Sequence, residues 1–420
     1  MTAARAAIDA IWRIESARIV AVVARIVDDV GLAEDLASSA LVSALEQWPR
    51  TGVPDNPGAW LTTVAKHKAI DALRRLRLHH DREATIEALA TPTALSPDEA
   101  AVIDHLDDDV GDDLLRLIFV SCHPLLPVEQ RLALTLRLVG GLTTDEIARA
   151  FLVAEPTIAQ RIVRAKRTLK EAGVAFVVPA VAERLTRLSS VLEVIYLVFN
   201  EGYAASRGDD WLRPELCDEA LRLGRVLARL VVDVAEVHGL VALMEIQASR
   251  NGARTTSTGE PVLLLEQDRA RWNHVLIRRG LAALATAQAL PHPGLYTLQA
   301  AIAACHARAK TAAATDWPLI VSHYDVLLSL TSSPVVALNR AVAVSMASGP
   351  AVALPLVDAL VDLPAMRAWH LVPSVRADVL LKLGRVDEAA VEFARAAALA
   401  NNAREKTFLM AKLAAITTRC

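Results

Sequence analysis

The stretch from Leu142 to Arg167 constrains the fold most, because it carries two short amphipathic helices separated by only three residues. Thr143 or Thr144 can cap the first helix, and Glu146 lies in its first turn, where an acid suits the positive helix end. Residues 152–154 form the turn, and a Glu-Pro-Thr sequence opens the second helix, with proline where its missing N–H costs nothing. The pattern predicts a helix-turn-helix.

The second helix of this motif has one apolar face and one basic face. Ile158, Ile162 and Ala165 recur at helical spacing and are expected to face inward. The outward set is Thr157, Gln160, Arg161, Arg164, Lys166 and Arg167. Arg and Gln form paired hydrogen bonds to base edges in the major groove, and the other cations neutralise phosphates. We therefore predict a DNA-reading helix; the alternative is a helical hairpin with a solvated basic face.

The composition favours an all-α protein. The chain of 420 residues is 53% hydrophobic but only 4% aromatic, and alanine and leucine favour helix. The net charge of −3 does not indicate nucleic-acid binding, but charge can be segregated by domain. The cysteines Cys122, Cys217, Cys305 and Cys420 form no C-x-x-C pair, so we expect isolated thiols in a cytoplasmic protein, with no metal site and no cofactor.

Residues 1–77 are interpreted as a first helical unit. Its first helix is expected to end at Gly31, its second to run from about Leu32 to Trp48, and its third from Pro57 to about Leu76. The third helix mixes an aromatic residue with clustered cations. Its DNA candidates are Trp60, Lys66, Lys68, Arg74 and Arg75, although Trp60 at this spacing is also typical of a core residue.

Residues 78–113 differ sharply in charge. Eleven acidic residues and one arginine between Asp81 and Asp113 give −10. This predicts a solvated linker, and the sharper alternative is a mimic of nucleic-acid charge in a basic channel of a partner. Residues 114–173 form a second helical unit, in which nine Lys or Arg against five Asp or Glu give +4.

The remaining chain is expected to be helical throughout, with an extension over residues 174–290 and repeats over residues 291–420. Gly349 and Gly384 lie 35 residues apart, close to the tetratricopeptide period of about 34 residues. The alternative is generic alanine-rich helical hairpins. The uncharged stretch around residues 280–307 contains Pro291 and Pro293, so we expect two helices joined by a turn and no membrane span.

Three motifs together resemble region 4 of extracytoplasmic-function sigma factors, which recognises the −35 promoter element. They begin Leu126-Pro127-x-Glu129-Gln130-Arg131, Gly141-Leu142-Thr143-x-Asp145-Glu146 and Thr157-Ile158-x-x-Arg161. The match runs over about forty-five residues in unbroken order. The resemblance implies a sigma factor that directs promoter-specific initiation, with core RNA polymerase and promoter DNA as partners; polymerase contacts at the β′ coiled coil and the β flap are implied with it.

The first helical unit is similar to region 2 of the same family. Pro57 to Arg75 resembles the part that opens the −10 element, and by that resemblance Asp55 and Asn56 lie near a captured base. The family usually has Asn where this chain has His67. The segment Gly31 to Leu36 resembles the part that binds polymerase, which implies exposed Glu34 and Asp35, with Leu36, at that interface.

The added C-terminal length resembles the ECF42 subgroup, which has a tetratricopeptide-like extension. Asn200-Glu201-Gly202-Tyr203 lies in a stretch that recurs there, and it is either a buried polar turn or a regulatory contact. Helical repeats usually bind proteins through a concave face. We therefore hypothesise that the extension controls polymerase engagement in cis, with a protein partner of its own.

Three alternatives remain open at this point. A helix-turn-helix repressor or activator would bind DNA without replacing a sigma factor. An enzyme would use His238, Glu245 or Cys305, but the sequence lacks H-E-x-x-H, G-x-S-x-G and a phosphate-binding glycine loop, so we expect no enzyme. A scaffold would leave both DNA-type units unexplained.

Overall fold

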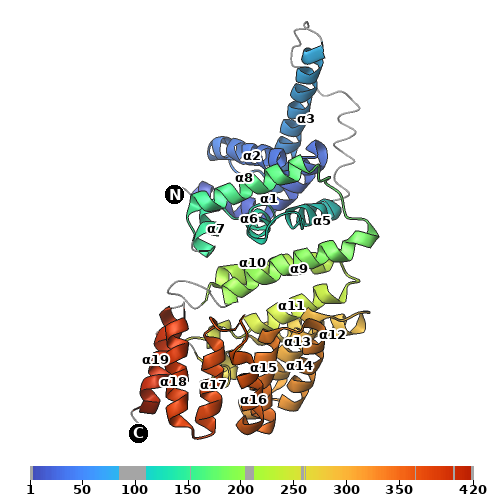
Figure 1. Ribbon diagram of the computed structural model, residues 1–420. Helices are drawn as coiled ribbons and strands as arrows, with labels where there is room; N and C mark the ends of the chain where they lie inside the picture. The colour runs from blue at the N-terminus through green and yellow to red at the C-terminus, as the bar shows by residue number, and fades with distance from the viewer. Residues whose placement is uncertain are drawn as a thin grey trace. The chain divides into compact units, whose positions relative to one another are not determined.

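A computed structural model describes residues 3–84, 110–151, 153–203, 212–256, 260, 262–364, 366–400 and 403–417 (Figure 1). All regular elements within these ranges are helices, as the composition predicts. The chain divides into two compact units, Met1–Ile195 and Tyr196–Cys420.

The first unit is built around a helix whose C-terminal part is completely buried. It comprises α1 (Ala3–Val27), α2 (Val30–Thr51), α3 (Pro57–Ala84), α5 (Val110–Ser121), α6 (Val128–Leu138), α7 (Thr144–Phe151), α8 (Glu155–Glu171) and the start of α9 (Val181–Tyr203). Residues 19–24 of α1 are each at most 2% exposed. Six consecutive helical residues point in all directions, so this part of α1 is covered on every side. Its cover comes from α2, α3 and α5, which all contact it.

The break between α1 and α2 lies three residues before the predicted one. Asp28 has a φ of 51°, and Asp29 caps α2 by accepting hydrogen bonds from the amides of Gly31 (2.8 Å) and Leu32 (3.0 Å). Gly31 itself lies in the first turn of α2. A short acidic side chain can accept amide bonds at a helix start, so the aspartate, and not the glycine, sets the boundary.

Only the ends of the predicted acidic linker fall on described residues. Residues 78–84 continue α3, and residues 85–109 lie outside the described ranges. Asp113 was expected in a solvated linker, and that is wrong. It is fully buried in α5, with Arg116 Nη1 at 2.8 Å and Arg25 Nε at 3.0 Å. Two cations compensate the cost of burying this carboxylate.

The second unit is a series of helices in which neighbours along the chain pack together (Figure 1). After the end of α9 come α10 (Pro214–Leu230), α11 (Ala235–Ala248), α12 (His274–Ala289), α13 (Leu295–Arg308), α14 (Trp317–Thr331), α15 (Pro334–Ser348), α16 (Pro350–Val361), α17 (Leu371–Lys382), α18 (Val386–Leu399) and α19 (Ala403–Thr417). The short 3₁₀ turns are η1 (Asn251–Ala253), η2 (Arg269–Arg271) and η3 (Ala312–Ala314).

The 35-residue spacing of two glycines corresponds to two equivalent turns. Gly349 joins α15 to α16 with a φ of 94°, and Gly384 lies between α17 and α18 with a φ of 75°. Glycine adopts this left-handed region without the steric cost that a side chain brings. The spacing therefore marks helical hairpins that stack as repeating units.

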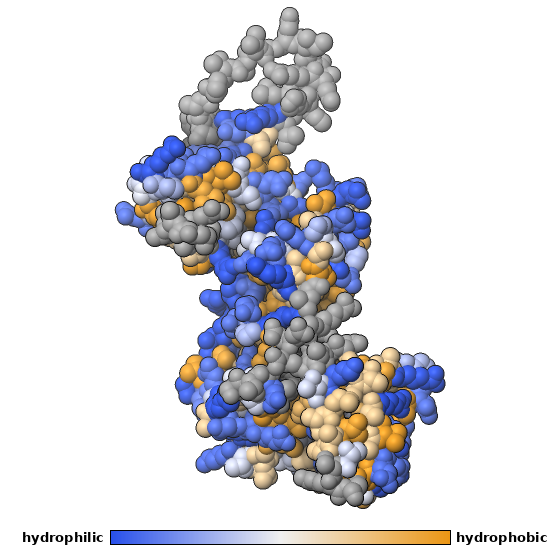
Figure 2. Space-filling model, turned by 90° about the vertical axis from the view of Figure 1, so that its left-hand side faces the viewer, coloured by the Kyte–Doolittle hydropathy of each residue, from blue (hydrophilic) through white to orange (hydrophobic). Residues whose placement is uncertain are grey.

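The surface of the second unit is not uniformly polar. Figure 2 shows hydrophilic side chains over much of one face, with an apolar patch among the C-terminal helices. In this part of the chain Val391 on α18 is 67% exposed and Met410 on α19 is 49% exposed.

Candidate functional site

The helix-turn-helix forms where the sequence predicts it, and its first helix begins with a reciprocal cap. The Glu146 amide donates to Thr143 Oγ1 (3.2 Å), while the Thr143 amide donates to Glu146 Oε2 (2.8 Å). Each side chain thus satisfies a backbone donor that the helix start leaves free. On α8 the predicted inner residues Ile158, Ile162 and Ala165 are buried.

The outward face of α8 divides into a free part and a bound part. Thr157, Gln160, Arg164 and Arg167 are exposed and Arg161 is half-buried, so this part is accessible along most of the helix. Lys166 was expected to face outward but is half-buried against α2. The free part is therefore open to solvent.

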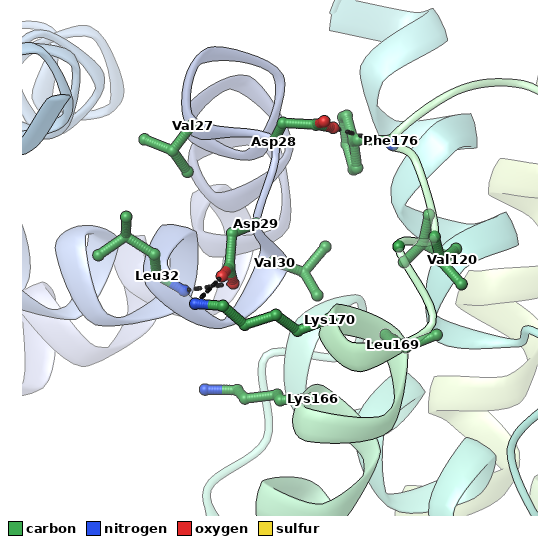
Figure 3. Close-up of a pocket in the computed structure, with 12 residues that line it drawn as sticks. Val27, Asp28, Asp29, Val30, Leu32, Val120, Lys166, Leu169, Lys170 and Phe176 are labelled. Carbon is green, nitrogen blue, oxygen red and sulfur yellow. Dashed lines mark hydrogen bonds and ion pairs between the residues drawn. The ribbon is translucent and has the colours of Figure 1, made fainter. Parts of the chain in front are cut away.

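The end of α8 meets the acidic start of α2, and we call this contact the α2–α8 junction. Glu34 accepts from Arg137 Nε at 2.6 Å and is ion-paired with Lys166 Nζ. Asp29 lies 2.9 Å from Lys170 Nζ, as Figure 3 shows. Two acids of α2 and its cap are therefore bound by three cations from α6 and α8.

The electrostatics of the junction favour ionised acids. Burial alone would raise the pKa of Glu34, but the charges of Lys166 and Arg137 lower that pKa below its ordinary value of 4.5. The pKa of Asp29 is also lowered, because its bonds to Lys170 and to two backbone amides outweigh burial. The carboxylates are thus charged at neutral pH and contribute attraction.

A hollow of about 390 Å³ lies beside the junction. Its wall includes Lys166, Lys170 and Phe176, whose amide donates to Asp28 Oδ1 at 3.1 Å (Figure 3). This hydrogen bond joins the segment after α8 to the break between α1 and α2. Charged and apolar groups share the wall of the hollow.

Glu34 was expected to be exposed, and that is wrong. It is only 8% exposed, because Arg137 and Lys166 cover it. Asp35 is exposed as expected, with its side chain 77% accessible and 3.8 Å from Lys166 Nζ. Leu36 is half-buried. A sequence pattern locates an acidic helix start but cannot reveal that another part of the chain covers it.

The DNA-binding candidates on α3 and in the loop before it also divide into exposed and buried residues. Asp55, Asn56, His67 and Arg75 are exposed, while Lys68 and Arg74 are half-buried. Lys66 is only 3% exposed, so its prediction as a surface cation is wrong. It lies on the inner side of α3, as do the buried residues Ala65 and Ala69. Trp60 is half-buried with its ring edge-on to Trp48, the centroids 5.3 Å apart.

Comparison with known proteins finds three matching segments of the chain. The family models of Sigma-70 region 2 and Sigma-70 region 4 match residues 12–78 and 116–169, and a family of unknown function (DUF6596) matches residues 187–288. The ECF RNA polymerase sigma factor SigL of Mycobacterium tuberculosis is 32% identical over 155 residues, which cover 36% of this chain and 81% of SigL. The chain belongs to the ECF sigma factors.

Two further relatives differ in how much they share with this sigma factor. A protein of Rhizobium meliloti, R00370, is 43% identical over 92% of this chain and 90% of its own length. The probable ECF sigma factor SigI of M. tuberculosis is 27% identical over 40% of this chain and 56% of its own length. No solved structure matches the chain. The long relative therefore shares the C-terminal half, which SigL does not.

As a sigma factor, the chain binds core RNA polymerase and promoter DNA and directs transcription initiation. A helix-turn-helix regulator that does not replace a sigma factor is set aside, because region 2 is present beside region 4. Sigma factors are initiation factors and not enzymes. None of the described helices is both long and apolar enough to cross a membrane.

The residues considered for an enzyme have structural partners instead. Glu245 is buried, with Arg225 Nε at 2.8 Å and Arg279 Nε at 3.5 Å. His238 Nε2 lies 2.9 Å from the Val232 carbonyl oxygen, and the Cys305 thiol donates to the Ala301 carbonyl. These contacts stabilise the helices of the second unit.

Three contacts between region 4 and the start of α9 were not predicted from the sequence. Arg131, in the Leu-Pro-x-Glu-Gln-Arg motif, is bonded to Ser190 and lies 2.9 Å from Glu193 Oε2. The Ser190 hydroxyl in turn donates to the Cys122 carbonyl at 2.7 Å. The start of α9 is therefore part of the region 4 core. A buried cation needs a partner, but the sequence does not show that Arg131 is buried.

Proposed function

We propose that the free part of α8 reads the −35 element and that the exposed residues around α3 contact the −10 element. Thr157, Gln160, Arg161, Arg164 and Arg167 supply groove and phosphate contacts. Asp55, Asn56 and Trp60 lie near the captured base, and His67, Lys68, Arg74 and Arg75 hold the backbone. The observation that supports this best is that α8 buries its apolar side while its amide and guanidinium groups are exposed.

We further propose that Asp35 and Leu36, with Glu34 once it is uncovered, bind the β′ coiled coil. Region 4 would contact the β flap. Asp35 supports this proposal, because its carboxylate is exposed at the start of α2 and suits a basic partner surface. Because the partner polymerase acts on the chromosome, the proposed location is the cytoplasm.

The α2–α8 junction has a consequence for how these surfaces are used. Promoter elements near −35 and −10 lie about 25 base pairs apart, which is about 85 Å along B-DNA at 3.4 Å per pair. In the junction the two regions are held within ion-pair distance of each other. The described conformation is therefore proposed to be a closed state, which polymerase and DNA open by competing for its charges.

The C-terminal helices are proposed to modulate this opening in cis. This proposal is supported by the contacts of α9. Ser190 and Glu193 at its start bind residues of region 4, and the helix then continues into the second unit. Any protein partner of these helices would find apolar surface at the exposed Val391 and Met410. The regulatory role of residues 200–203 stays a proposal; they form the last turn of α9 and not a separate turn.

In-vitro transcription with core polymerase and a pool of genomic promoter fragments tests the central proposal. The full chain should give transcripts that start at a common pair of upstream elements, and none should appear without it. A chain ended after Ile195 keeps the first unit intact and tests the modulation. Equal activity and equal salt sensitivity of the two chains would contradict modulation in cis without affecting the sigma function.

A further inference from the structure

Three arginines of the second unit gather around two aromatic rings, and we call them the arginine cluster. The Cζ atom of Arg254 lies 3.6 Å from the ring centroid of Tyr203, and that of Arg269 lies 4.8 Å from Trp272. Arg250 lies between the two rings, at 5.8 Å from Tyr203 and 6.0 Å from Trp272. All five residues fall within the segment 187–288 that matches the family of unknown function.

The cluster differs from the other arginines of this unit in its partners. Ion pairs with carboxylates join Arg213 to Glu201 (2.5 Å), Arg222 to Glu219 (2.7 Å), Arg225 to Glu245 (2.8 Å), Arg340 to Asp325 (2.5 Å) and Arg376 to Asp358 (2.8 Å). Within the part of the chain that the structure describes, no carboxylate pairs with Arg250, Arg254 or Arg269. Three positive charges therefore meet without a negative one among these residues.

The hydrogen bonds of the cluster go to neutral oxygens. Arg250 donates to the Tyr203 hydroxyl (2.7 Å), and Arg254 donates to the Tyr203 carbonyl. Arg269 donates to the carbonyls of His306 and Ala309, at the end of α13. Helix carboxyl ends carry only partial negative charge, so they orient these side chains without neutralising them.

The charges of the cluster also disfavour one another. Burial and then the charge of Arg250 lower the pKa of Arg269. Burial lowers the pKa of Arg254, which is 9% exposed; Tyr203 opposes this shift and Arg250 adds to it. Burial, followed by Arg250 and Arg269, lowers the pKa of His306 to about 4, so this histidine is neutral at pH 7. The site is thus cationic through its arginines alone.

Buried donors in the cluster also lack acceptors. The Nε atoms of Arg250 and Arg269 and the Nε1 atom of Trp272 are buried with no hydrogen-bond partner among the described residues. Trp272 as a whole is 4% exposed. A buried donor without an acceptor is destabilising, so three of them together with three like charges favour an anionic acceptor.

We propose that the arginine cluster binds the phosphoryl group of a small molecule. A phosphate carries a charge of about −1.5 to −2 at pH 7 and has three strong acceptor oxygens, whereas a carboxylate has one charge and two oxygens. Guanidinium groups match phosphate oxygens with parallel hydrogen bonds. The ligand is either free inorganic phosphate or a phosphorylated metabolite, because both present the same group.

Thermal unfolding of the full chain tests the proposal, with inorganic phosphate added at constant ionic strength against chloride. A ligand that binds only the folded state raises the melting temperature in a saturable way. The wild type and the control Arg340→Met, which removes an ion-paired arginine, should both show the rise. Arg250→Met should lose it, and calorimetric titration should give a dissociation constant at least about tenfold weaker for Arg250→Lys, which keeps the charge but not the fork.

The two sources separate when adenosine monophosphate and glycerol phosphate are titrated beside inorganic phosphate. Tighter binding of one organic phosphate assigns a metabolite, and equal affinities assign free phosphate. A melting temperature that does not respond to any of them, or an equal response in Arg250→Met, overturns the proposal.

Discussion

The α2–α8 junction and the arginine cluster solve the problem of partly buried charge in opposite ways. In the junction, Glu34 and Asp29 each face a cation from a distant segment of the chain. In the cluster, Arg250, Arg254 and Arg269 face rings, carbonyls and one another. A competitor must break existing pairs to enter the junction, whereas an anion entering the cluster adds pairs. The paired charges of the junction suit a contact that a partner can break, whereas the arginines of the cluster, which pair with no described carboxylate, suit a site that binds an anion.

The largest effect is expected when the charge of Glu34 in the junction is reversed. Glu34→Lys places a third cation beside Arg137 and Lys166, and breaking a buried pair in this way costs about 3–5 kcal/mol. The amides of α8 should then exchange hydrogen much faster, because the closed state no longer holds. Glu46→Lys makes the same change at an exposed position of α2 and should leave exchange unaltered. Equal exchange in both variants would show that the junction does not hold the two regions together.

The free part of α8 allows the next largest prediction. Arg164→Ala should weaken binding of promoter fragments by polymerase holoenzyme about 10- to 100-fold, since one good base contact contributes about 1–3 kcal/mol. Lys166→Ala removes the same charge from the same helix but at the junction, so it should weaken promoter binding much less. Filter binding of both variants at one salt concentration compares them. A larger loss for Lys166→Ala would reassign the DNA-reading face.

The sequence predicted the two helices of the motif and their inner faces because both depend on local spacing. Ile158, Ile162 and Ala165 lie on one side of any helix, whatever surrounds it. It did not predict that Glu34 is buried, because Arg137 and Lys166 lie more than a hundred residues away and nothing local marks their approach. Lys66 was misplaced for a related reason, since clustered cations on a helix do not show which one turns inward.

The break between α1 and α2 at Asp28 and Asp29 also differs from the predicted one, although here the contacts are local. A glycine suggested a helix end at Gly31, but the cap of Asp29 and the left-handed Asp28 moved the break upstream. The arginine cluster was not anticipated at all. Its two aromatic rings are 69 residues apart in the sequence, and only folding brings Tyr203 and Trp272 to the same guanidinium group.

A third prediction uses pH to test the ion pairs of the junction. The folded-state pKa of Glu34 lies below 4.5, so its stabilising contribution is complete above pH 4.5 and is lost as the pH falls through the lower folded value. Urea unfolding followed by circular dichroism should therefore show Glu34→Gln to be less stable than wild type at pH 7. This difference should shrink toward zero as the pH is lowered below 4.5.

Glu46→Gln provides the control for that titration. It makes the same change at an exposed position of α2, so the stability difference between Glu46→Gln and wild type should be small and should change little over the same interval. If the two differences fall together, the loss of stability at low pH is a property of the whole chain and not of the junction.

The smallest effect concerns two buried thiols, one in each unit. Burial raises the pKa of Cys122 to about 11 and that of Cys217 to about 12. At pH 8 about one thiol in a thousand or fewer is then ionised, and the thiolate is the reactive form. Iodoacetamide should leave both unmodified in the folded chain and label both in urea, as peptide mass spectrometry can follow. Labelling of Cys122 without urea, with Cys217 still protected, would mean that the first unit opens by itself, and this would sharpen its contrast with the second.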